Sequence, residues 1–296
     1  MRFGAWARRV NCDFNKGITA MNDNIDPLVL QRDTLNPYRV GLGLAWYQLK
    51  WDLRPEAWRS RSVVRSWKNR FAGNRAVILC NGPSLLKVDF DALRNSGVYC
   101  FGLNKINLLF EKTEFRPSCV VAVNQFVIEQ NASFYNTTEL PLFLSNCGVG
   151  LVRGRPNVAF LSSTVFPKFS RDCSVGIFAG GTVTFVALQL AFHMGFTDVA
   201  LVGADHNFAT KGPANQTVVS GEKDESHFDP NYFAGGVKWQ LPDLLQSEVA
   251  YTMARDMYAA FGRRVVNATE GGKLEVFDRM PVSDFLGDVS VPDRTQ

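Results

Sequence analysis

The residues of this sequence that could bind or transform a small molecule follow short apolar runs. The run 77–80 stops at Asn81-Gly82-Pro83-Ser84, and further runs stop at Asn104, at Asn124 and at Asp205-His206. A side-chain amide offers two hydrogen-bond donors and an acceptor, which suits the base edges and ribose hydroxyls of a nucleotide. Asparagine is also a common turn residue, so each one alone is weak evidence. Their repetition at the ends of several runs predicts a nucleotide site that includes residues 81–84, Asn104, Asn124 and Asp205.

A second glycine turn, Gly180-Gly181-Thr182, stands directly before a long apolar segment with a helical pattern. Backbone N–H groups in the first turn of a helix bind anions, so these residues are candidates for contact with the nucleotide phosphate. The alternative is that two glycines permit a tight turn and close packing. Neither glycine turn has the Walker A spacing or the spacing GxGxxG. The sequence favours neither interpretation over the other.

The chain has three histidines, and histidine is the usual proton acceptor near neutral pH. His206 follows an apolar run directly. His227 lies in the polar segment Ser-His-Phe-Asp-Pro, after the segment 210–225, which we predict to be a mobile loop. His193 lies within an apolar helical pattern and is expected in the core or on a helix surface. His227 and His206 are therefore the two candidates for a general base, and Asp229 is expected to orient His227 if the chain turns at Pro230.

Strand-like and helix-like patterns alternate from residue 74 onward. The apolar runs that predict strands are 76–80, 98–104, 119–124, 141–146, 158–162, 198–203 and 263–269, and helical patterns lie at 125–135, 182–196 and 241–263. Continuous apolar runs that alternate with helices are typical of a parallel sheet with both faces covered. We therefore predict an α/β domain over residues 74–285, with a mostly parallel Rossmann-like sheet and helices on both faces, followed by a tail at 286–296. Ligands of such sheets bind beyond the carboxyl ends of the strands.

Residues 1–73 are predicted to be a helical extension rich in tryptophan and arginine. Five of the six tryptophans lie there, namely Trp6, Trp46, Trp51, Trp58 and Trp67. A helical pattern begins near Leu42 and breaks near Pro55. Tryptophan and arginine together can hold a helix at a membrane surface, which would make residues 1–70 a membrane-binding segment. The alternative is that the tryptophans pack on the main domain while the arginines face water.

Net charge, cysteine spacing and the length of the apolar runs argue against several classes of protein for this chain. A net charge of +4 does not indicate a nucleic-acid-binding protein. The six cysteines are scattered without a CxxC motif, so we expect reduced core residues and no metal site of the zinc type. The first residues lack the apolar segment of a signal peptide, and no apolar run approaches the roughly 20 residues that span a bilayer. These features predict a cytoplasmic protein, peripheral at the inner membrane face if the extension binds lipid.

Residues 74–275 resemble the small bacterial sialyltransferases that use CMP-sialic acid. They resemble still more the MptE-like domain family, which is named for a 6-hydroxymethylpterin diphosphokinase and is also found in the flagellin-modifying motility accessory factors. The resemblance rests on Asn-Gly-Pro-Ser-Leu after the first strand, the strand-end Asn104 and Asn124, the Gly-Gly turn, and the segments 195–205 and 226–228.

The resemblance implies roles for individual residues. Asn81, Ser84, Asn104 and Asn124 would hold the CMP moiety, with a contribution from Gly180-Gly181-Thr182. Two departures concern the leaving phosphate, which the family's tyrosines stabilise, and the catalytic base. The sialyltransferases place two tyrosines after the Gly-x-Asp segment, whereas residues 206–217 contain none. Their catalytic base is a second histidine, and Asn231 stands at that place, so His227 matches only the first.

These observations predict a glycosyltransferase that uses a CMP-activated acidic sugar, such as a sialic-acid-like nonulosonate or Kdo, to modify an envelope or surface glycan. The acceptor would be a glycan or a lipid-linked sugar, and no cofactor would be required. One alternative is a diphosphokinase with ATP and Mg²⁺ held near Asp205 and Asp229, because hard cations prefer oxygen ligands. Another is a nucleotide-binding module without catalysis.

Overall fold

The computed structural model describes residues 37–287, except 208–212, 225 and 234. The predictions for residues 1–36, which include Trp6 and Cys12, lie outside the described residues, as do those for the tail from residue 288 onward. Within the described part, no helix is long and apolar enough to cross a bilayer.

Seven parallel strands form the central sheet, in the order β11-β8-β1-β2-β3-β4-β5. They are β1 (Arg75–Leu79), β2 (Tyr99–Leu103), β3 (Cys119–Ala122), β4 (Leu142–Ser145), β5 (Val158–Leu161), β8 (Asp198–Val202) and β11 (Arg264–Asn267). Six of them lie within a predicted apolar run, and β1 begins one residue before its run, at Arg75. The sheet confirms the predicted α/β class with a parallel Rossmann-like arrangement.

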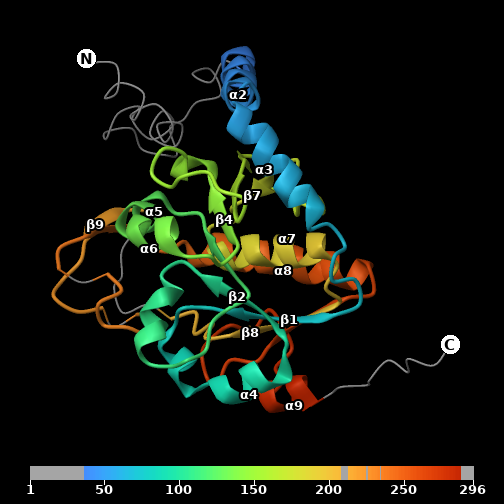
Figure 1. The fold of residues 1–296 in the computed structure, drawn as a ribbon, viewed down its shortest axis with the longest axis vertical. Helices are drawn as coiled ribbons and strands as arrows, with labels where there is room; N and C mark the ends of the chain where they lie inside the picture. The colour runs from blue at the N-terminus through green and yellow to red at the C-terminus, as the bar shows by residue number, and fades with distance from the viewer. Residues whose placement is uncertain (1–36, 208–212, 225, 234, 288–296) are drawn as a thin grey trace.

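Helices cover both faces of this sheet, as predicted (Figure 1). Helices α7 (Val183–Met194) and α8 (Leu244–Ala260) pack against each other on one face, and α4 (Phe90–Ser96) and α9 (Val282–Gly287) lie on the opposite face. The remaining helical segments of the domain are η2 (Pro83–Lys87), η3 (Ile106–Glu111), α5 (Gln125–Gln130), α6 (Ala132–Thr137) and η4 (Asn146–Gly148). The sheet is therefore the middle layer of three.

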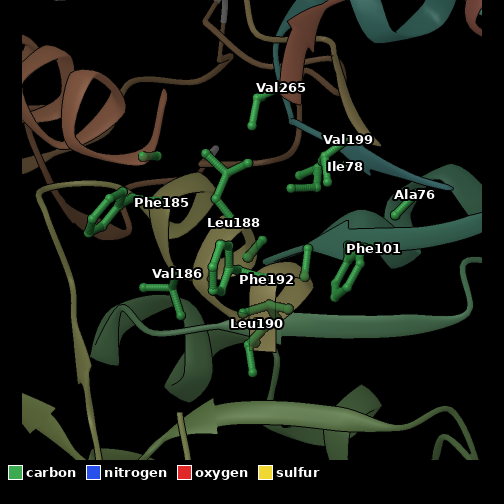
Figure 2. Close-up of a cluster of buried hydrophobic side chains, with 14 of the residues drawn as sticks. Ala76, Ile78, Phe101, Phe185, Val186, Leu188, Leu190, Phe192, Val199 and Val265 are labelled. Carbon is green, nitrogen blue, oxygen red and sulfur yellow. The ribbon is translucent and has the colours of Figure 1, made fainter. Parts of the chain in front are cut away.

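Successive side chains of each strand enter two different cores. Ile78 of β1 packs with Val199 of β8 and with α7, as Figure 2 shows. Val77 and Leu79 face the other side and join the core that contains Leu93 of α4. Because neither face meets water, the strands are apolar at nearly every position except their ends, which explains the continuous apolar runs in the sequence.

Two short strand pairs lie outside the main sheet. One is β6 (Ser163–Thr164) with β7 (Ile177–Phe178), and the other is β9 (Thr217–Val219) with β10 (Lys238–Gln240). The sequence predicted neither pair. Strand β9 falls inside the segment 210–225, so that prediction of a loop is wrong for these three residues, which are held by antiparallel pairing with β10.

Among the residues that the structure describes, two helices precede the sheet, with the break at Pro55 that the sequence predicted. They are α2 (Pro37–Asp52) and α3 (Pro55–Ser66), and proline at the first position of α3 suits a helix start because its missing N–H would have no partner there. Helix α3 lies along the edge strand β5. Arg59 donates to the Val158 carbonyl at 2.7 Å, and Phe160 N donates to Ser60 Oγ at 3.0 Å. These bonds satisfy backbone groups of an edge that would otherwise be unpaired.

The tryptophans of this region differ in environment. Trp51 is buried, and Trp67 packs edge-on against Phe143 with ring centroids 5.7 Å apart. Trp46 and Trp58 are 58% and 66% exposed. Packing on the main domain therefore accounts for two of these residues and leaves the other two in solvent.

The predictions for cysteine and for His193 are confirmed within the described residues. Cys80, Cys100, Cys119 and Cys173 are buried and reduced, and Cys147 is partly buried and reduced. His193 is 1% exposed, and its Nε2 hydrogen-bonds the Val64 carbonyl at 2.9 Å. These side chains belong to the core.

Candidate functional site

Strands β1 and β8 are neighbours, and the chain leaves their carboxyl ends in opposite directions. From β1 it passes to β2 on one side, and from β8 it passes to β11 on the other. In open parallel sheets, ligands bind where the strand order reverses in this way. The segment Asn81-Gly82-Pro83-Ser84 follows β1, and Asp205-His206 follows β8. The sheet thus places two of the predicted segments at the position where a ligand is expected.

Asp205 fixes the conformation of the segment 81–84. Its Oδ2 accepts hydrogen bonds from Ser84 N at 3.1 Å and from Ser84 Oγ at 2.7 Å. Gly82 N donates to the Gly203 carbonyl at 2.9 Å. A Cβ atom on Gly82 would overlap the Asp205 carboxylate and stand 2.7 Å from the Gly203 oxygen, so only glycine permits this approach. Because a carboxylate already receives the Ser84 donors, Asp205 is a positioning residue for this segment.

Two asparagine side-chain oxygens just beyond the ends of β1 and β2 accept no hydrogen bond from the described residues. Leu79 pairs with Gly102, so Asn81 and Asn104 stand at equivalent places, each two residues further on. Asn81 is 8% exposed, and within the described residues neither Asn81 Oδ1 nor Asn104 Oδ1 accepts a hydrogen bond. The hydroxyl of Tyr232 lies beside the Asn104 side chain, but without hydrogen-bond geometry. A buried oxygen without a donor costs free energy, so both atoms are ready to accept from a ligand.

The backbone at Asn104 is adapted to this position. Its φ is 48°, in the left-handed region that asparagine adopts more readily than most residues. Its N–H donates to the Val121 carbonyl at 2.8 Å, and its carbonyl accepts from the Tyr135 hydroxyl at 2.8 Å. The backbone is therefore held on both sides while the side-chain oxygen has no partner.

Lys105 is a residue of this region that the sequence did not reveal. It is 8% exposed, and its Nζ donates to Gln130 Oε1 at 2.7 Å and to the Tyr232 carbonyl at 2.6 Å. Burial lowers the pKa of Lys105 to about 8. Lysine is ordinarily a surface residue, so nothing in the sequence distinguishes this one. Its hydrogen bonds join the segment around Tyr232 to the end of β2.

His227 forms a dyad with Asp224. Its Nδ1 lies 2.7 Å from Asp224 Oδ2, and its ring is stacked on Tyr232 with centroids 4.0 Å apart. Burial favours the neutral carboxyl, yet the hydrogen bond and charge of His227 hold the pKa of Asp224 below its usual value. Phe228 N donates to the Asn81 carbonyl at 2.9 Å, which places the dyad beside the end of β1. A histidine oriented by a carboxylate is the arrangement of a general base.

Asp229 does not orient His227, contrary to the sequence-based expectation. It accepts from Asn231 N at 2.8 Å and forms an ion pair with Lys112, with Nζ 2.7 Å from Oδ2. Although burial opposes ionisation, the hydrogen bond from Lys112 holds the pKa of Asp229 below its usual value. After the turn at Pro230, Asp229 pairs with Lys112, which is distant in sequence. Asp224 is the carboxylate that orients His227.

His206 belongs to a second polar group on the α7 side of the sheet. Its Nε2 lies 3.0 Å from Glu248 Oε1 of α8, and its ring contacts Tyr251 edge-on. The Tyr251 hydroxyl is 3.4 Å from Thr182 Oγ1, which caps α7 by accepting from Thr184 N. His227 instead packs with side chains of the α4 face. The two candidate bases therefore belong to different groups on either side of β1.

The turn Gly180-Gly181 supports close packing. Both glycines have positive φ, 61° and 77°. A Cβ on Gly180 would stand 2.8 Å from the Ala250 Cβ, and one on Gly181 would stand 3.0 Å from Gln246 Oε1. The packing interpretation of this turn is thus satisfied, and contact with a phosphate stays a prediction. The hydroxyl of Thr184 lies 3.5 Å from Cys80 Sγ, so the start of α7 adjoins the end of β1.

Asn124 caps helix α5. Its Oδ1 accepts from Phe126 N at 2.9 Å and from Val127 N at 3.4 Å, and its Nδ2 donates to Gln240 Oε1 at 3.3 Å. The oxygen that the sequence-based prediction assigned to a nucleotide is therefore already engaged with the backbone. Contact between a nucleotide and this side chain stays a prediction.

We expect Asn124→Ala to lower the free energy of unfolding by about 0.5–2 kcal/mol, the usual effect of losing a helix cap. Asn124→Asp keeps the capping oxygen and is expected to retain most of the stability. Denaturant unfolding of the two variants and the wild type measures the effect. If Asn124→Asp is stable but binds nucleotide more than tenfold more weakly, the amide N–H is a ligand contact and the role is not confined to capping.

The diphosphokinase alternative predicts that ATP and Mg²⁺ are held near Asp205 and Asp229. Among residues 37–287, apart from the gaps stated above, no group of three or more histidine, cysteine, aspartate or glutamate side chains is placed to hold a metal ion. Asp205 bonds Ser84, and Asp229 bonds Lys112.

The chain is similar to one protein family and to a solved glycosyltransferase structure. The family model described as 6-hydroxymethylpterin diphosphokinase MptE-like matches residues 57–211, just over half of the chain. A solved structure entitled "Structure of MAf glycosyltransferase from Magnetospirillum magneticum AMB-1" is similar, with a TM-score of 0.45 and 16% sequence identity. The similarity covers 77% of this chain and 39% of that one, so the present chain spans about two fifths of its length. No curated protein matches the sequence.

Proposed function

We propose that this chain, which belongs to the 6-hydroxymethylpterin diphosphokinase MptE-like family, is a glycosyltransferase with a CMP-activated acidic sugar as its donor. The observation that carries the proposal is the pair of buried oxygens, Asn81 Oδ1 and Asn104 Oδ1, that accept no hydrogen bond within the described residues. A ligand that brings hydrogen-bond donors would satisfy both acceptors. The amino group of cytosine and the hydroxyls of ribose are donors, whereas phosphate oxygens are not.

The donor sugar in this proposal is a sialic-acid-like nonulosonate or Kdo, and the acceptor is a hydroxyl of an envelope, surface or lipid-linked glycan. The hydroxyl oxygen attacks the anomeric carbon, and the bond from that carbon to the phosphate oxygen breaks, with its electron pair leaving on CMP. His227 takes the proton of the attacking hydroxyl. Asp224, which lies 2.7 Å from Nδ1, stabilises the imidazolium that forms. His206 is the other candidate for the general base, and we assign it to nucleotide binding.

The alternative function is that of a diphosphokinase, which the description of the family favours. It requires ATP and Mg²⁺, and Asp205 at the end of β8 would be the nearest carboxylate to the segment 81–84. Transfer of a diphosphate depends on a metal ion that neutralises the phosphates. Nucleotide preference and metal dependence therefore separate the two functions.

The test is a thermal-shift comparison of CMP, CDP, UDP, GDP and ATP, each with and without Mg²⁺. We expect CMP and CDP to raise the unfolding temperature more than the purine nucleotides do, and to need no metal. A ligand that binds only the folded state at about 100 times its Kd adds about 2.7 kcal/mol of stability. A response to ATP that depends on Mg²⁺, without a response to cytidine nucleotides, would overturn the proposal in favour of the diphosphokinase.

The same measurement on variants locates the nucleotide. Asn104→Gly removes the amide and keeps the left-handed backbone free of strain, so its effect on the fold is small. We expect CMP affinity to fall by about 1–3 kcal/mol, as for the loss of hydrogen bonds in a buried site. Asn95→Ala, at an exposed position of α4, is the matched control and leaves affinity unchanged. Unaltered CMP binding by Asn104→Gly would show that the nucleotide binds elsewhere.

A further inference from the structure

Helix α2 and Leu53, the turn residue directly after it, carry a row of exposed apolar side chains, which we call the α2 stripe: Tyr38, Leu42, Trp46, Leu49 and Leu53. Their spacing of three or four residues places them along one face of the helix. Tyr38, Leu42 and Leu53 are each more than 70% exposed, and Trp46 is 58% exposed. Single apolar residues are ordinary on a protein surface, whereas a continuous row indicates a surface that binds something.

The α2 stripe is separate from the candidate site. Figure 1 shows α2 beyond α3, at the end of the molecule and away from the α7–α8 layer. The buried side chain of Trp51 lies near the end of α2, and the helix packs on α3. The stripe is therefore not needed to form the core that supports the ends of β1 and β8.

Charge is distributed unevenly around this helix. Residues 37–73 contain eight lysines and arginines and two acidic residues, whereas the rest of the chain has two more acidic than basic residues. Both acids of this region are paired with arginines, Asp52 with Arg61 and Glu56 with Arg59, and Lys68 is paired with Asp172 of the main domain. Lys50 Nζ lies 5.4 Å from the centre of the Trp46 ring, at the edge of the stripe. An apolar row with excess positive charge beside it is complementary to an anionic, apolar surface.

We propose that the α2 stripe binds the surface of an anionic phospholipid bilayer, with the helix lying in the plane of the interface. Leu42, Leu49 and Leu53 would enter the acyl boundary, and Trp46 would sit at the level of the headgroups, where indole is favoured. The surplus cations would meet lipid phosphates and carboxylates, which attract basic residues close to the surface. The charge complementarity favours this occupant over a second copy of the same positively charged helix.

The test is co-sedimentation of the full chain with vesicles of phosphatidylcholine alone and with vesicles that contain about one third phosphatidylserine. We expect binding to the anionic vesicles that weakens as salt is raised, because salt screens the lipid charge. The variant Leu42→Ser/Trp46→Ser/Leu49→Ser is expected to reduce the partition coefficient by about tenfold or more, since it removes apolar area that would enter the acyl boundary.

The matched control is Leu245→Ser/Val249→Ser, which removes exposed apolar side chains from α8 and is expected to bind vesicles as the wild type does. All substituted positions are exposed, so the unfolding temperature should be nearly unchanged for both variants. The proposal is overturned if the wild type does not bind anionic vesicles or if the stripe variant binds equally well. It is also overturned if the stripe variant changes only the oligomeric state, because the occupant is then a second copy.

Discussion

His227→Asn is expected to lower the rate of sugar transfer by about 10²-fold or more, the usual contribution of a general base, while CMP affinity stays within a few-fold of the wild-type value. The amide of asparagine can still donate a hydrogen bond to Asp224 in place of Nδ1, so the dyad keeps its local contact. It provides no basic nitrogen for the hydroxyl proton. Turnover of the donor, by transfer or by hydrolysis, together with calorimetric titration of CMP, measures both quantities on the same preparation.

His206→Asn is the comparison for this experiment. Because His206 bonds Glu248 on the α7 side of the sheet, we expect its replacement to weaken nucleotide binding rather than the chemical step. Full activity of His227→Asn would exclude His227 as the base. Loss of CMP binding in that variant would instead make His227 a nucleotide contact.

Gly82→Ala is expected to reduce the free energy of unfolding by about 1–3 kcal/mol, the usual cost of adding atoms to a well-packed position. The backbone of Gly82, with φ −72°, suits alanine, so the whole effect comes from the added methyl group. That group would overlap the Asp205 carboxylate and approach the Gly203 oxygen. Displacing Asp205 frees the donors of Ser84 and shifts Asn81, so CMP affinity should fall with stability. Denaturant unfolding and CMP titration measure the two effects.

Gly221→Ala is the control for Gly82→Ala, because a Cβ at residue 221 would meet no atom within 4 Å. We expect its stability and CMP affinity to equal those of the wild type. If Gly82→Ala is as stable as Gly221→Ala, the contact between Asp205 and Ser84 does not hold the segment in place. If it is destabilised yet binds CMP normally, Asn81 is not part of the nucleotide site.

Much of the fold could be predicted because its main signals are local. Each strand of the central sheet is a run of apolar residues, since both faces are covered, and each run stops near the strand end. Proline at residue 55 marked the boundary between α2 and α3 correctly. The capping role of Asn124 could also have been recognised, because asparagine directly before a helical pattern is a preferred cap.

The parts of the site that could not be predicted depend on contacts between distant segments. Asp205 contacts Ser84 across 121 residues, and the Lys105 hydrogen bond to Tyr232 spans 127 residues. The choice between Asp224 and Asp229 as the partner of His227 depends on Lys112, which is far away in sequence and occupies Asp229. Sequence identified the residue types and the ends of the strands, while the pairings among side chains followed from the tertiary structure.

The position of β1 in the middle of the sheet has a consequence for the order of folding during synthesis. Counted from the first residue of each strand, its partner β2 begins 24 residues after β1, whereas its other partner, β8, begins 123 residues after it. Until residue 205 has left the ribosome, one edge of β1 has no strand to pair with, and Ser84 has no carboxylate to bind. Long-range parallel pairing forms slowly, and an unpaired edge is open to association with other chains. The nascent protein would therefore be most vulnerable to aggregation while residues 104–198 are being made.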